Sequence, residues 1–498
     1  GQDGGTPGED INVETVWSGN TGNGVRIAIV DDGLDIKHED LACNVVEGAS
    51  YDYLYGDTDP TDLPEDDSPY LNGHGTAVAG VAAAVGDNGI GVRGVAPSAE
   101  LVGYSLLDNA TYANISDAMT RGSNDIASNS WGPADNGRFH IAPTLWESAI
   151  ESGLANGRGG KGTIYTWAAG NGDAPAGTGT ADNSNYDAMA NFYGTFAIGA
   201  LNDKGQKASY SEEGANLLVV TPSGEFCDTN ATTTTDRMHS EGYNAGSSYN
   251  SGAYDNANAN YTDCFNGTSS ATPVASGTIA LMLAANPNLS WRDVRLILAK
   301  SARQNDVGDA DWVTNGGGLK VNHKYGYGVI DAQTAVNMAK SWISVGGKAS
   351  QLIREYTSSP SVPITDGFGT STAPSYGTTV IDTISITSSD IANIEFVEIT
   401  VDISHAAGTS DLDVQIESPS FIISRLANVH GCDDYALDKC KDSWNVPTNG
   451  YADGWRFGSE RYIDEAADGT WTIRVKDGWS GDTGILNSWT LKIYGRLG

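Results

Sequence analysis

Hydrophobic and polar positions alternate in two different ways along the chain. Between residues 25 and 340, short runs of apolar residues are separated by longer segments with helical periodicity. This alternation is typical of a doubly wound, mostly parallel α/β sheet covered by helices. Strands are predicted at 27–31, 101–108 and 128–132, and helices at 10–17, from 74 onward, from 269 to about 286, at 290–300 and at 332–340.

A different pattern follows residue 377. There apolar and polar residues alternate with a period of two, and Gly and Asp mark the turns, which indicates a β-sandwich or jelly roll. Residues 346–377 are rich in Gly, Ser, Thr and Pro, and we interpret them as a linker or edge region. The sequence therefore predicts an α/β domain at residues 1–344 and an all-β domain at residues 345–498. The clearest strands of the second domain are predicted at 394–403, 412–419, 470–476 and 488–494.

A small-residue turn at residues 266–268 places the hydroxyl of Ser269 at the start of an apolar helix. Unpaired backbone N–H groups and the positive helix end surround a side chain at such a place. That environment suits a nucleophile that must hold an oxyanion beside it. Because Gly-Thr-Ser before a helix is usually only a cap, the catalytic interpretation needs a base and an acid elsewhere in the chain.

Both partners are present. Asp31 ends a buried-strand pattern, and His74 opens a helix of small residues. Asn171 follows another buried strand and offers a side-chain amide as a donor for an oxyanion hole. The order Asp, His, Ser is the one found in the subtilisin arrangement. Because chance rarely supplies four such motifs in order, the sequence predicts a serine hydrolase.

With these motifs the sequence resembles the subtilase serine proteases, and residues 130–137 resemble the kexin/furin branch in particular. The resemblance implies that Asp31 orients the imidazole of His74 and stabilises it when charged. It implies that His74 takes the proton of Ser269 and returns it to the leaving amine. Asn171 would join the backbone N–H of Ser269 in holding the oxyanion.

The all-β segment is similar to the P domain that follows the catalytic domain in kexin-like proteases. The matching stretches are residues 411–419, 455–457 and 484–489. No catalytic group of residues is visible there. We expect this domain to support the fold of the catalytic domain, with binding of a host or substrate surface as the alternative.

In subtilases, two strand edges pair with the extended backbone of the substrate from both sides. Here the corresponding edges would be residues 101–108 and the stretch Ser130, Trp131 and Gly132. The resemblance therefore implies that these three residues bind substrate.

Acidic residues set the expected specificity. In the kexin/furin branch, carboxylates at the positions of Asp135 and Asp187 line the first pocket and receive an arginine or a lysine. A bidentate carboxylate–guanidinium pair is the physical reason for an arginine preference. Asp32 matches the acid that is associated with the second pocket. An acid that serves a calcium ion or a solvated loop is the alternative for Asp187.

The sequence also departs from the furin pattern. Leu71 and Gly73 stand where that pattern has other residues around the histidine motif, Thr120 replaces the outer-pocket acid, and Met189 replaces an aromatic residue. We therefore expect a basic residue before the cut, with a weaker demand for a second or fourth basic residue.

Calcium is the expected cofactor, because hard cations prefer several carboxylate and carbonyl oxygens. The resemblance implies two sites. The first would use Asp40 with backbone or amide oxygens of Val85, Asn88, Ile90 and Val92, and the second would use Asp135, Asp182 and Glu212.

Residues 225–264 are low in aliphatic residues and rich in Gly, Ser, Asn and Tyr. This composition predicts a surface loop inserted just before the nucleophile. Its position favours a role in substrate access or maturation, and an insertion that is merely tolerated is an equal alternative.

Composition narrows the possible partners. The 63 acidic and 28 basic residues give a net charge of −35, which argues against nucleic acid because phosphates would be repelled. The same charge favours cations, basic substrates and solubility outside the cell. No apolar run reaches the ~18 residues of a membrane span. The sequence starts at Gly1 without methionine or leader, which favours a processed form.

Five cysteines cannot all pair within one chain. Cys432 and Cys440 are one candidate pair, and Cys227 and Cys264, which flank the insertion, are another. Cys43 would then be left as a buried thiol. The connectivity stays open, and a secreted compartment is the expectation.

Together these features predict a secreted, monomeric, calcium-dependent serine endopeptidase that cleaves protein or peptide substrates after Arg or Lys. A pro-segment or folding helper is a possible partner. Three alternatives remain: a subtilase with broad apolar preference, an inactive protease-like scaffold, and an adhesive P-domain protein whose proteolysis is incidental.

Overall fold

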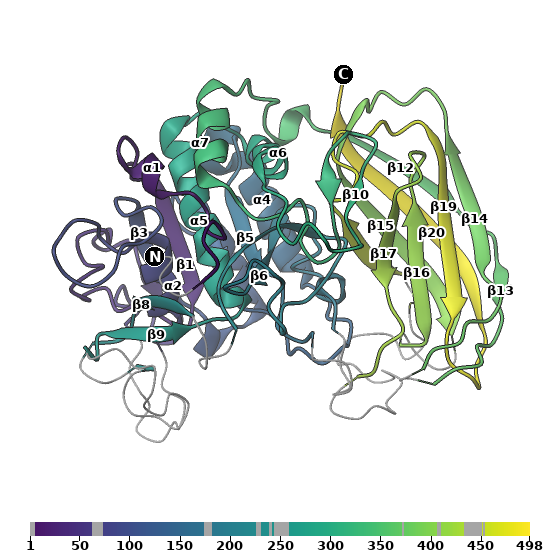
Figure 1. Cartoon of the computed structure of the whole chain (residues 1–498), viewed down its shortest axis with the longest axis horizontal. Coiled ribbons are helices and arrows are strands. Elements are labelled where there is room, and N and C mark those ends of the chain that lie inside the picture. The colour runs from purple at the N-terminus through teal and green to yellow at the C-terminus, as the bar shows by residue number, and fades with distance from the viewer. Residues whose placement is uncertain are drawn as a thin grey trace.

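The computed structural model shows two bodies side by side, an α/β layer structure and a β-sandwich (Figure 1). The N-terminal residues belong to the first body and the C-terminus to the second. The structure describes residues 5–61, 73–173, 182–225, 231–238, 242–243, 258–370, 373–405, 410–432, 451 and 454–498.

A seven-stranded sheet forms the centre of the first body, with every neighbouring pair parallel. Its strand order is β2-β3-β1-β4-β5-β6-β7, so the chain changes direction of winding around β1. This confirms the predicted parallel α/β sheet. The strands are β1 (Arg26–Asp31), β2 (Tyr51–Asp52), β3 (Glu100–Ser105), β4 (Ile126–Asn129), β5 (Ile164–Ala168), β6 (Thr195–Leu201) and β7 (Leu217–Pro222).

Helices cover both faces of this sheet. Tyr165 and Thr166 follow one another in β5 and therefore point to opposite faces. The hydroxyl of Tyr165 donates to the carbonyl of Met119 in α3, and that of Thr166 bonds Ser276 in α5, both at 2.8 Å. The helices are α1 (Glu14–Trp17), α2 (His74–Ala83), α3 (Tyr112–Thr120), α4 (Thr144–Gly160), α5 (Thr268–Ala285), α6 (Trp291–Ser301) and α7 (Ala332–Ser341), with short 3₁₀ turns η1 (Leu107–Asn109), η2 (Ser184–Tyr186) and η3 (Lys348–Ser350).

The predicted surface insertion is in part a structural element. Its described residues include β8 (Thr232–Thr235), which pairs antiparallel with β9 (Tyr261–Phe265). The buried hydroxyls of Thr234 and Thr235 donate to backbone carbonyls of α2 at 2.8 and 2.7 Å. The expectation of a plain surface loop is therefore wrong for these residues, because threonine hydroxyls let a polar sequence pack on a helix. Residues 226–230, 239–241 and 244–257 lie outside the described residues.

The second body is a β-sandwich of a five-stranded and a four-stranded sheet, as predicted. One sheet holds β12 (Leu352–Ser358), β13 (Val362–Ile364), β15 (Asn393–His405), β18 (Trp455–Ser459) and β20 (Gly484–Arg496). The other holds β14 (Val380–Ile386), β16 (Leu412–Glu417), β17 (Ile423–Ala427) and β19 (Gly469–Asp477). A separate small ribbon pairs β10 (Val313–Thr314) with β11 (Lys320–Val321).

Residues 346–377 are expected to form a linker or an edge region, and the edge alternative holds for residues 352–364, because β12 and β13 both pair with β20 at the edge of the sheet. Their side chains are only half-buried, so the edge position needs few apolar residues and leaves a weak sequence signal. The boundary near residue 345 stays a prediction.

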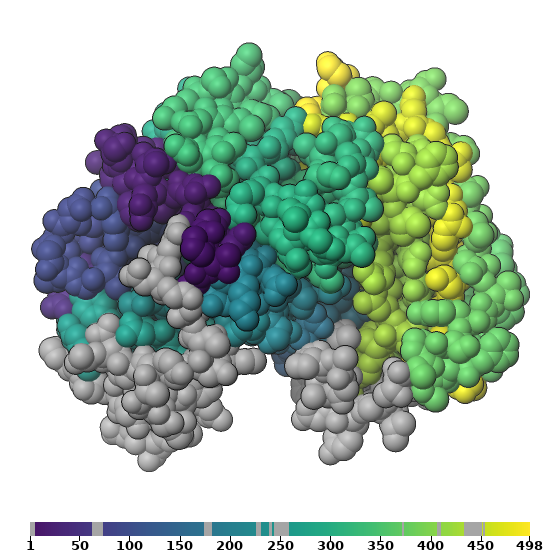
Figure 2. Space-filling view, in the orientation of Figure 1, coloured from purple at the N-terminus to yellow at the C-terminus, as the bar shows by residue number. Residues whose placement is uncertain are grey.

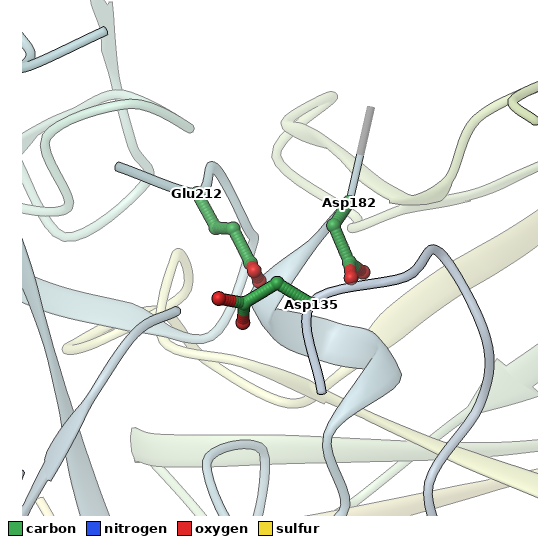
Figure 3. A group of neighbouring side chains, drawn as sticks. All are labelled: Asp135, Asp182 and Glu212. Carbon is green, nitrogen blue, oxygen red and sulfur yellow. The ribbon is translucent and has the colours of Figure 1, made fainter. Parts of the chain in front are cut away.

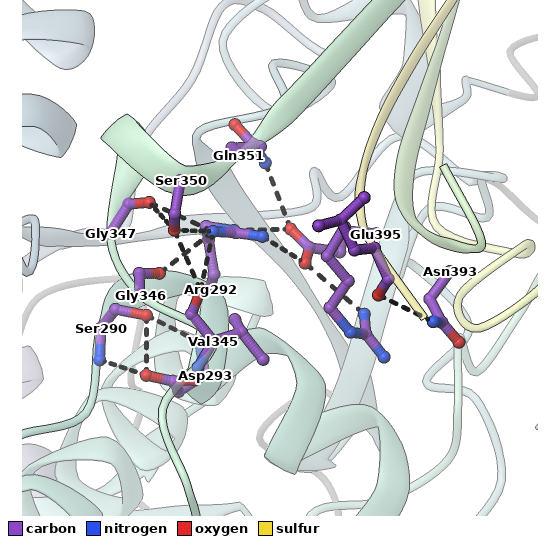
Figure 4. A network of polar contacts seen from close by, with 12 residues as sticks. Ser290, Arg292, Asp293, Val345, Gly346, Gly347, Ser350, Gln351, Asn393 and Glu395 are labelled. Carbon is purple, nitrogen blue, oxygen red and sulfur yellow. Dashed lines mark hydrogen bonds and ion pairs between the residues drawn. The ribbon is translucent and has the colours of Figure 1, made fainter. Parts of the chain in front are cut away.

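A buried ion pair joins the two bodies. The surfaces of the α/β and β-rich halves meet without a break through their upper part (Figure 2). Within this contact, Arg292 of α6 makes two 2.7 Å hydrogen bonds to Glu395 of β15, and the two side chains are 0 and 1% exposed. The guanidinium of Arg292 also donates to the backbone carbonyls of residues 345–347 (Figure 4).

Breaking this pair should destabilise the fold strongly. Replacing Glu395 with Gln leaves the guanidinium of Arg292 buried without its counter-charge, which we expect to cost about 3–5 kcal/mol of unfolding free energy. Denaturant unfolding measures this loss. The control is Asp390→Asn, because Asp390 pairs with Arg354 where both side chains are more than 40% exposed, and we expect a loss of about 0–1 kcal/mol there. Equal losses in the two variants would contradict the prediction.

The cysteines differ in part from the expectation. Cys43 is exposed and not the buried thiol that we expected, because it lies in a surface turn after Leu41. Cys227 and Cys440 lie outside the described residues, so both cysteine pairs stay predictions.

Among the residues that the structure describes, no helix combines the length and apolar character needed to cross a membrane.

Candidate active site

Asp31 and His74 meet at the carboxyl edge of the parallel sheet. Asp31 is the last residue of β1 and is fully buried, and His74 is the first residue of α2. His74 Nδ1 lies 2.7 Å from Asp31 Oδ1. Burial disfavours the charged imidazole, but the charge and the hydrogen bond of Asp31 outweigh it and raise the pKa of His74. The imidazole therefore accepts a proton more readily than a free histidine does.

The first turn of α2 presses closely on the end of β1. A Cβ at Gly75 would lie 2.0 Å from the carbonyl oxygen of Gly33, so only glycine allows this approach. The carboxylate of Asp32 accepts hydrogen bonds from the backbone N–H groups of Gly73, His74 and Gly75 at 3.2, 3.0 and 2.7 Å. Asp32 thus caps this helix and fixes the position of the histidine.

The predicted role of Asp32 in a second substrate pocket stays a prediction. Both of its carboxylate oxygens are used by the helix start. Burial, together with the neighbouring charge of Asp31, raises the pKa of Asp32 to about 6.

Ser269 lies in the first turn of α5, as the sequence predicts. Its hydroxyl donates to the carbonyl of Ser130 at 3.1 Å, and the hydroxyl of Ser130 donates to the carbonyl of Ser269 at 3.0 Å. These two bonds fix the end of β4 to the start of α5. The described residues show no hydrogen bond between Ser269 and His74 in this arrangement. Such bonds are often long or poorly aligned until a substrate binds.

Asn171 is oriented by a residue that sequence reasoning missed. The side-chain oxygen of Asn171 accepts from the backbone N–H and from the hydroxyl of Thr268, at 2.8 and 3.0 Å. Because the oxygen is held in this way, the amide nitrogen is left to donate to a ligand. The signal in the sequence was the hydroxyl residue immediately before Ser269.

A cavity of about 210 Å³ opens beside Ser269 and Asn171. It joins residues from distant parts of the chain, and it includes all the predicted first-pocket residues. Arg138 and His140 also line it and were not predicted, although both lie in the same segment as Asp135. The predicted residues that line it are Ser130, Trp131, Gly132, Asp135, Asp182, Asp187 and Glu212.

The carboxylates of Asp135 and Asp187 are suited to bind a cation. Burial, followed by repulsion from Asp135, raises the pKa of Asp187 to about 7. The backbone N–H of Met189 donates to Asp187 at 2.8 Å and holds the carboxylate in place. Partial desolvation also raises the pKa of Asp135, which stays accessible to solvent. A guanidinium or ammonium group in this cavity would relieve the cost of keeping these carboxylates charged.

Asp135, Asp182 and Glu212 converge from three separate loops (Figure 3). One oxygen of each carboxylate lies within 4.8 Å of the others. Burial raises the pKa of Asp182 to about 7, and burial with the charge of Asp182 raises that of Glu212 well above its usual range. Three oxygen donors that repel one another fit a divalent cation such as calcium.

The loop around Asp40 fits a cation less well as it stands. Both carboxylate oxygens of Asp40 accept from N–H donors, one from the side chain of Asn88 at 2.6 Å and one from the backbone of Val92 at 2.8 Å. The backbone N–H of Val85 donates to the Asp40 carbonyl at 2.9 Å. Ile90 donates its N–H to the Asn88 side chain. The five predicted residues are thus brought together, but through hydrogen bonds.

Comparison with known proteins identifies the class that this fold and site define. Residues 22–328 match the subtilase family, and residues 394–493 match the proprotein convertase P-domain. The chain belongs to the subtilase family, a family of serine endopeptidases, and carries a P domain after it. The resemblance to the kexin/furin branch is thereby confirmed.

Relatives within that family include proprotein convertases and kexin. The chain is 34% identical to proprotein convertase subtilisin/kexin type 7 of Mus musculus, over 99% of this chain and 59% of the mouse protein. It is 35% identical to kexin of Saccharomyces cerevisiae, over 98% of this chain and 54% of the yeast protein. The chain thus spans little more than half the length of these relatives.

A solved structure has the same fold over nearly the whole chain. It is the serine protease of Aeromonas sobria in complex with the chaperone ORF2. The TM-score is 0.84 at 27% sequence identity, and the match covers 99% of this chain and 92% of that one. The α/β body followed by a β-rich body is therefore shared with a known protease.

Proposed function

We propose that the protein is a serine endopeptidase in which Ser269 is the nucleophile. The observation that carries the proposal is the hydrogen-bonded pair of buried Asp31 and partly exposed His74, together with a cavity lined by Ser269 and Asn171. Ser269 Oγ attacks the scissile carbonyl carbon while His74 takes its proton through Nε2. Asp31 holds the opposite ring nitrogen and stabilises the imidazolium.

The oxyanion has two donors in this proposal. The amide nitrogen of Asn171 and the backbone N–H of Ser269 bond the oxygen that becomes negative in the tetrahedral intermediate. When that intermediate collapses, His74 gives the proton to the leaving amine and Ser269 keeps the acyl group. A water molecule, deprotonated by His74, then releases the acid and restores the hydroxyl.

We further infer that the first pocket prefers Arg or Lys. Its support is the pair of acids, Asp135 and Asp187, at the cavity that opens beside the nucleophile. The experiment is cleavage of a peptide library that differs only in the residue before the scissile bond. Strong cleavage after Arg and Lys supports the proposal. Equal cleavage after Leu or Phe would overturn it and leave a subtilase of broad preference.

Calcium is the proposed cofactor, held by Asp135, Asp182 and Glu212 behind this pocket. When bound, the ion supplies positive charge that offsets the repulsion among the three carboxylates. These residues in turn fix the segments at 135–139 and 182–187, because Asp182 also accepts from the backbone N–H of Gly137 at 2.8 Å. The loop of Asp40 remains a second, weaker proposal for a calcium site.

Removal of calcium should lower stability measurably. At a calcium concentration of 100 times the dissociation constant, binding contributes about 2.7 kcal/mol, and a chelator should remove that amount. Thermal unfolding with calcium and with chelator measures it. Glu212→Gln should lose most of this calcium-dependent increment, whereas the control Glu213→Gln should keep it. An unchanged unfolding temperature of the wild-type protein after chelation would contradict the prediction.

The remaining proposals concern partners and compartment. We infer a monomer that acts outside the cell on proteins or peptides with basic residues, and that folds with a pro-segment or a helper. The chaperone in the Aeromonas sobria complex supports a helper, and the net charge of −35 supports an extracellular, cation-rich setting. The pairs Cys227–Cys264 and Cys432–Cys440 are proposed as disulfides.

A further inference from the structure

The wall of the first pocket rests on the P domain. The pocket segment of Asp135 continues into Phe139, whose ring stacks on Trp455 of β18 with centroids 4.5 Å apart. Tyr451 and Phe457 pack around the same ring, and all four aromatic side chains are buried. The end of this pocket segment is therefore embedded in P-domain aromatic side chains.

The segment of Asp187 is held by the same strand. The side-chain amide of Asn185 donates to the carbonyl of Gly458 at 3.0 Å and accepts from its N–H at 2.7 Å. Beyond Asp187, the guanidinium of Arg456 donates to the carbonyl of Ala188 at 2.6 Å. Because β18 is an edge strand of its sheet, the catalytic domain completes hydrogen bonding that the sheet leaves open.

Gly137 links the P domain to the carboxylates of the pocket. Its N–H donates to Asp182 at 2.8 Å, and its carbonyl oxygen lies 2.8 Å from Nε2 of His430, which donates to it when that nitrogen carries the ring proton. The other ring nitrogen, Nδ1, lies 2.6 Å from the carbonyl oxygen of Asn428. Its φ of +74° and the 2.5 Å that would separate a Cβ from the carbonyl of Gly431 exclude other residues. The ring of His430 is buried and stacks on Tyr186, next to Asp187, at 4.7 Å.

These contacts differ from the rest of the interface between the two bodies. The pair Arg292–Glu395 also joins the two bodies, but none of the hydrogen bonds of Arg292 within the described residues reaches a residue that lines the cavity. His430 instead bonds a residue two positions from Asp135 and stacks on a residue adjacent to Asp187. If the interface only held the two bodies together, substitution of any interface residue would lower stability without changing substrate preference. If His430 supports the pocket, its substitution would also change which substrate is cleaved.

We propose that His430 of the P domain is a positioning residue for the first pocket. By holding the carbonyl of Gly137, it fixes Asp135 and Asp187 at the separation at which both face a cationic side chain. The inference rests on the proposed function, because it assumes that this pocket receives the residue before the scissile bond.

The test compares two variants of His430 in the full chain with calcium present. His430→Phe keeps an aromatic ring against Tyr186 and removes the donor to Gly137. His430→Gln keeps a side-chain N–H donor. For each, kcat and KM are measured on two peptides that differ only by Arg or Leu before the cut. Binding of benzamidine, an arylamidinium, is measured in parallel as a readout that needs no turnover.

We expect His430→Phe to raise KM for the Arg peptide and the dissociation constant of benzamidine by about tenfold, below the ~100-fold that a 1 Å misplacement can cost. The Leu peptide should be cleaved as by the wild type. His430→Gln should recover most of the loss. The matched control is Glu395→Gln, which should lower the unfolding temperature and leave the ratio of Arg to Leu cleavage unchanged.

An equal loss on both peptides in His430→Phe, or a changed ratio in Glu395→Gln, would overturn the inference, because either result describes a clamp that only supports folding. A wild-type protein that shows no Arg preference and does not bind benzamidine would instead defeat the proposed preference for Arg or Lys, and the inference with it. The two failures are therefore distinguishable in one set of measurements.

Discussion

Replacing Ser269 with Ala is expected to lower kcat for peptide hydrolysis by about 10⁶-fold, the scale reached when a catalytic triad loses its nucleophile. The reason is that Ser269 is the proposed nucleophile, at the start of α5 and in the wall of the cavity that Asn171 also lines. Stability should change little, because the Ser269 hydroxyl makes one hydrogen bond, to the carbonyl of Ser130. Single-turnover hydrolysis and thermal unfolding of the same samples measure both quantities.

Ser270→Ala is the matched control. Ser270 follows in the same helix turn and is buried, but its hydroxyl donates to Thr232 of β8. It should keep activity within about tenfold. Fluorophosphonate labelling should mark the wild-type protein and not Ser269→Ala. A protein that is labelled equally in both forms, or not at all in the wild type, would refute the triad and favour a protease-like scaffold that binds without cleaving.

The parts of the site that the sequence predicted are those that local chemistry determines. The sequence predicts that Asp31 ends a buried strand and that His74 begins a helix. Strand ends and helix starts meet at the same edge of a parallel sheet, so the two residues are expected to lie close together. The hydroxyl of Ser269 at a helix start follows from the same rule. The structure brings Asp135, Asp182 and Glu212 together. The family resemblance predicts this grouping, whereas the spacing of the three residues along the chain does not.

The parts that the sequence did not predict depend on contacts between distant segments. Nothing near Asp32 indicates that its carboxylate caps α2, and nothing near Thr268 indicates that it orients Asn171. The polar sequence of β8 predicts a surface loop, whereas its Thr234 and Thr235 are buried through hydrogen bonds and not through apolar area. The contact of His430 with Gly137 joins residues almost 300 positions apart, and no local sequence pattern predicts it.

Asp187→Asn should weaken the preference for Arg and leave the chemistry intact. The amide keeps the shape of the carboxylate but cannot offset a buried guanidinium, and losing one partner of such a pair costs about 2–4 kcal/mol. We expect kcat/KM for an Arg peptide to fall by roughly 30- to 1,000-fold, with little change for the matched Leu peptide. The control Asp173→Asn removes an acid that pairs with Lys207 and does not line the cavity.

The pH dependence of this preference supplies a second, independent check. Because burial raises the pKa of Asp187 to about 7, the carboxyl is increasingly protonated as the pH falls below that value in the free enzyme. The ratio of Arg to Leu cleavage should therefore rise as the pH increases through about 7 and level off above it. Protonation of His74 affects both peptides alike and cancels in the ratio. In Asp187→Asn the rise should disappear, and a rise that persists there would refute the assignment of this titration to Asp187.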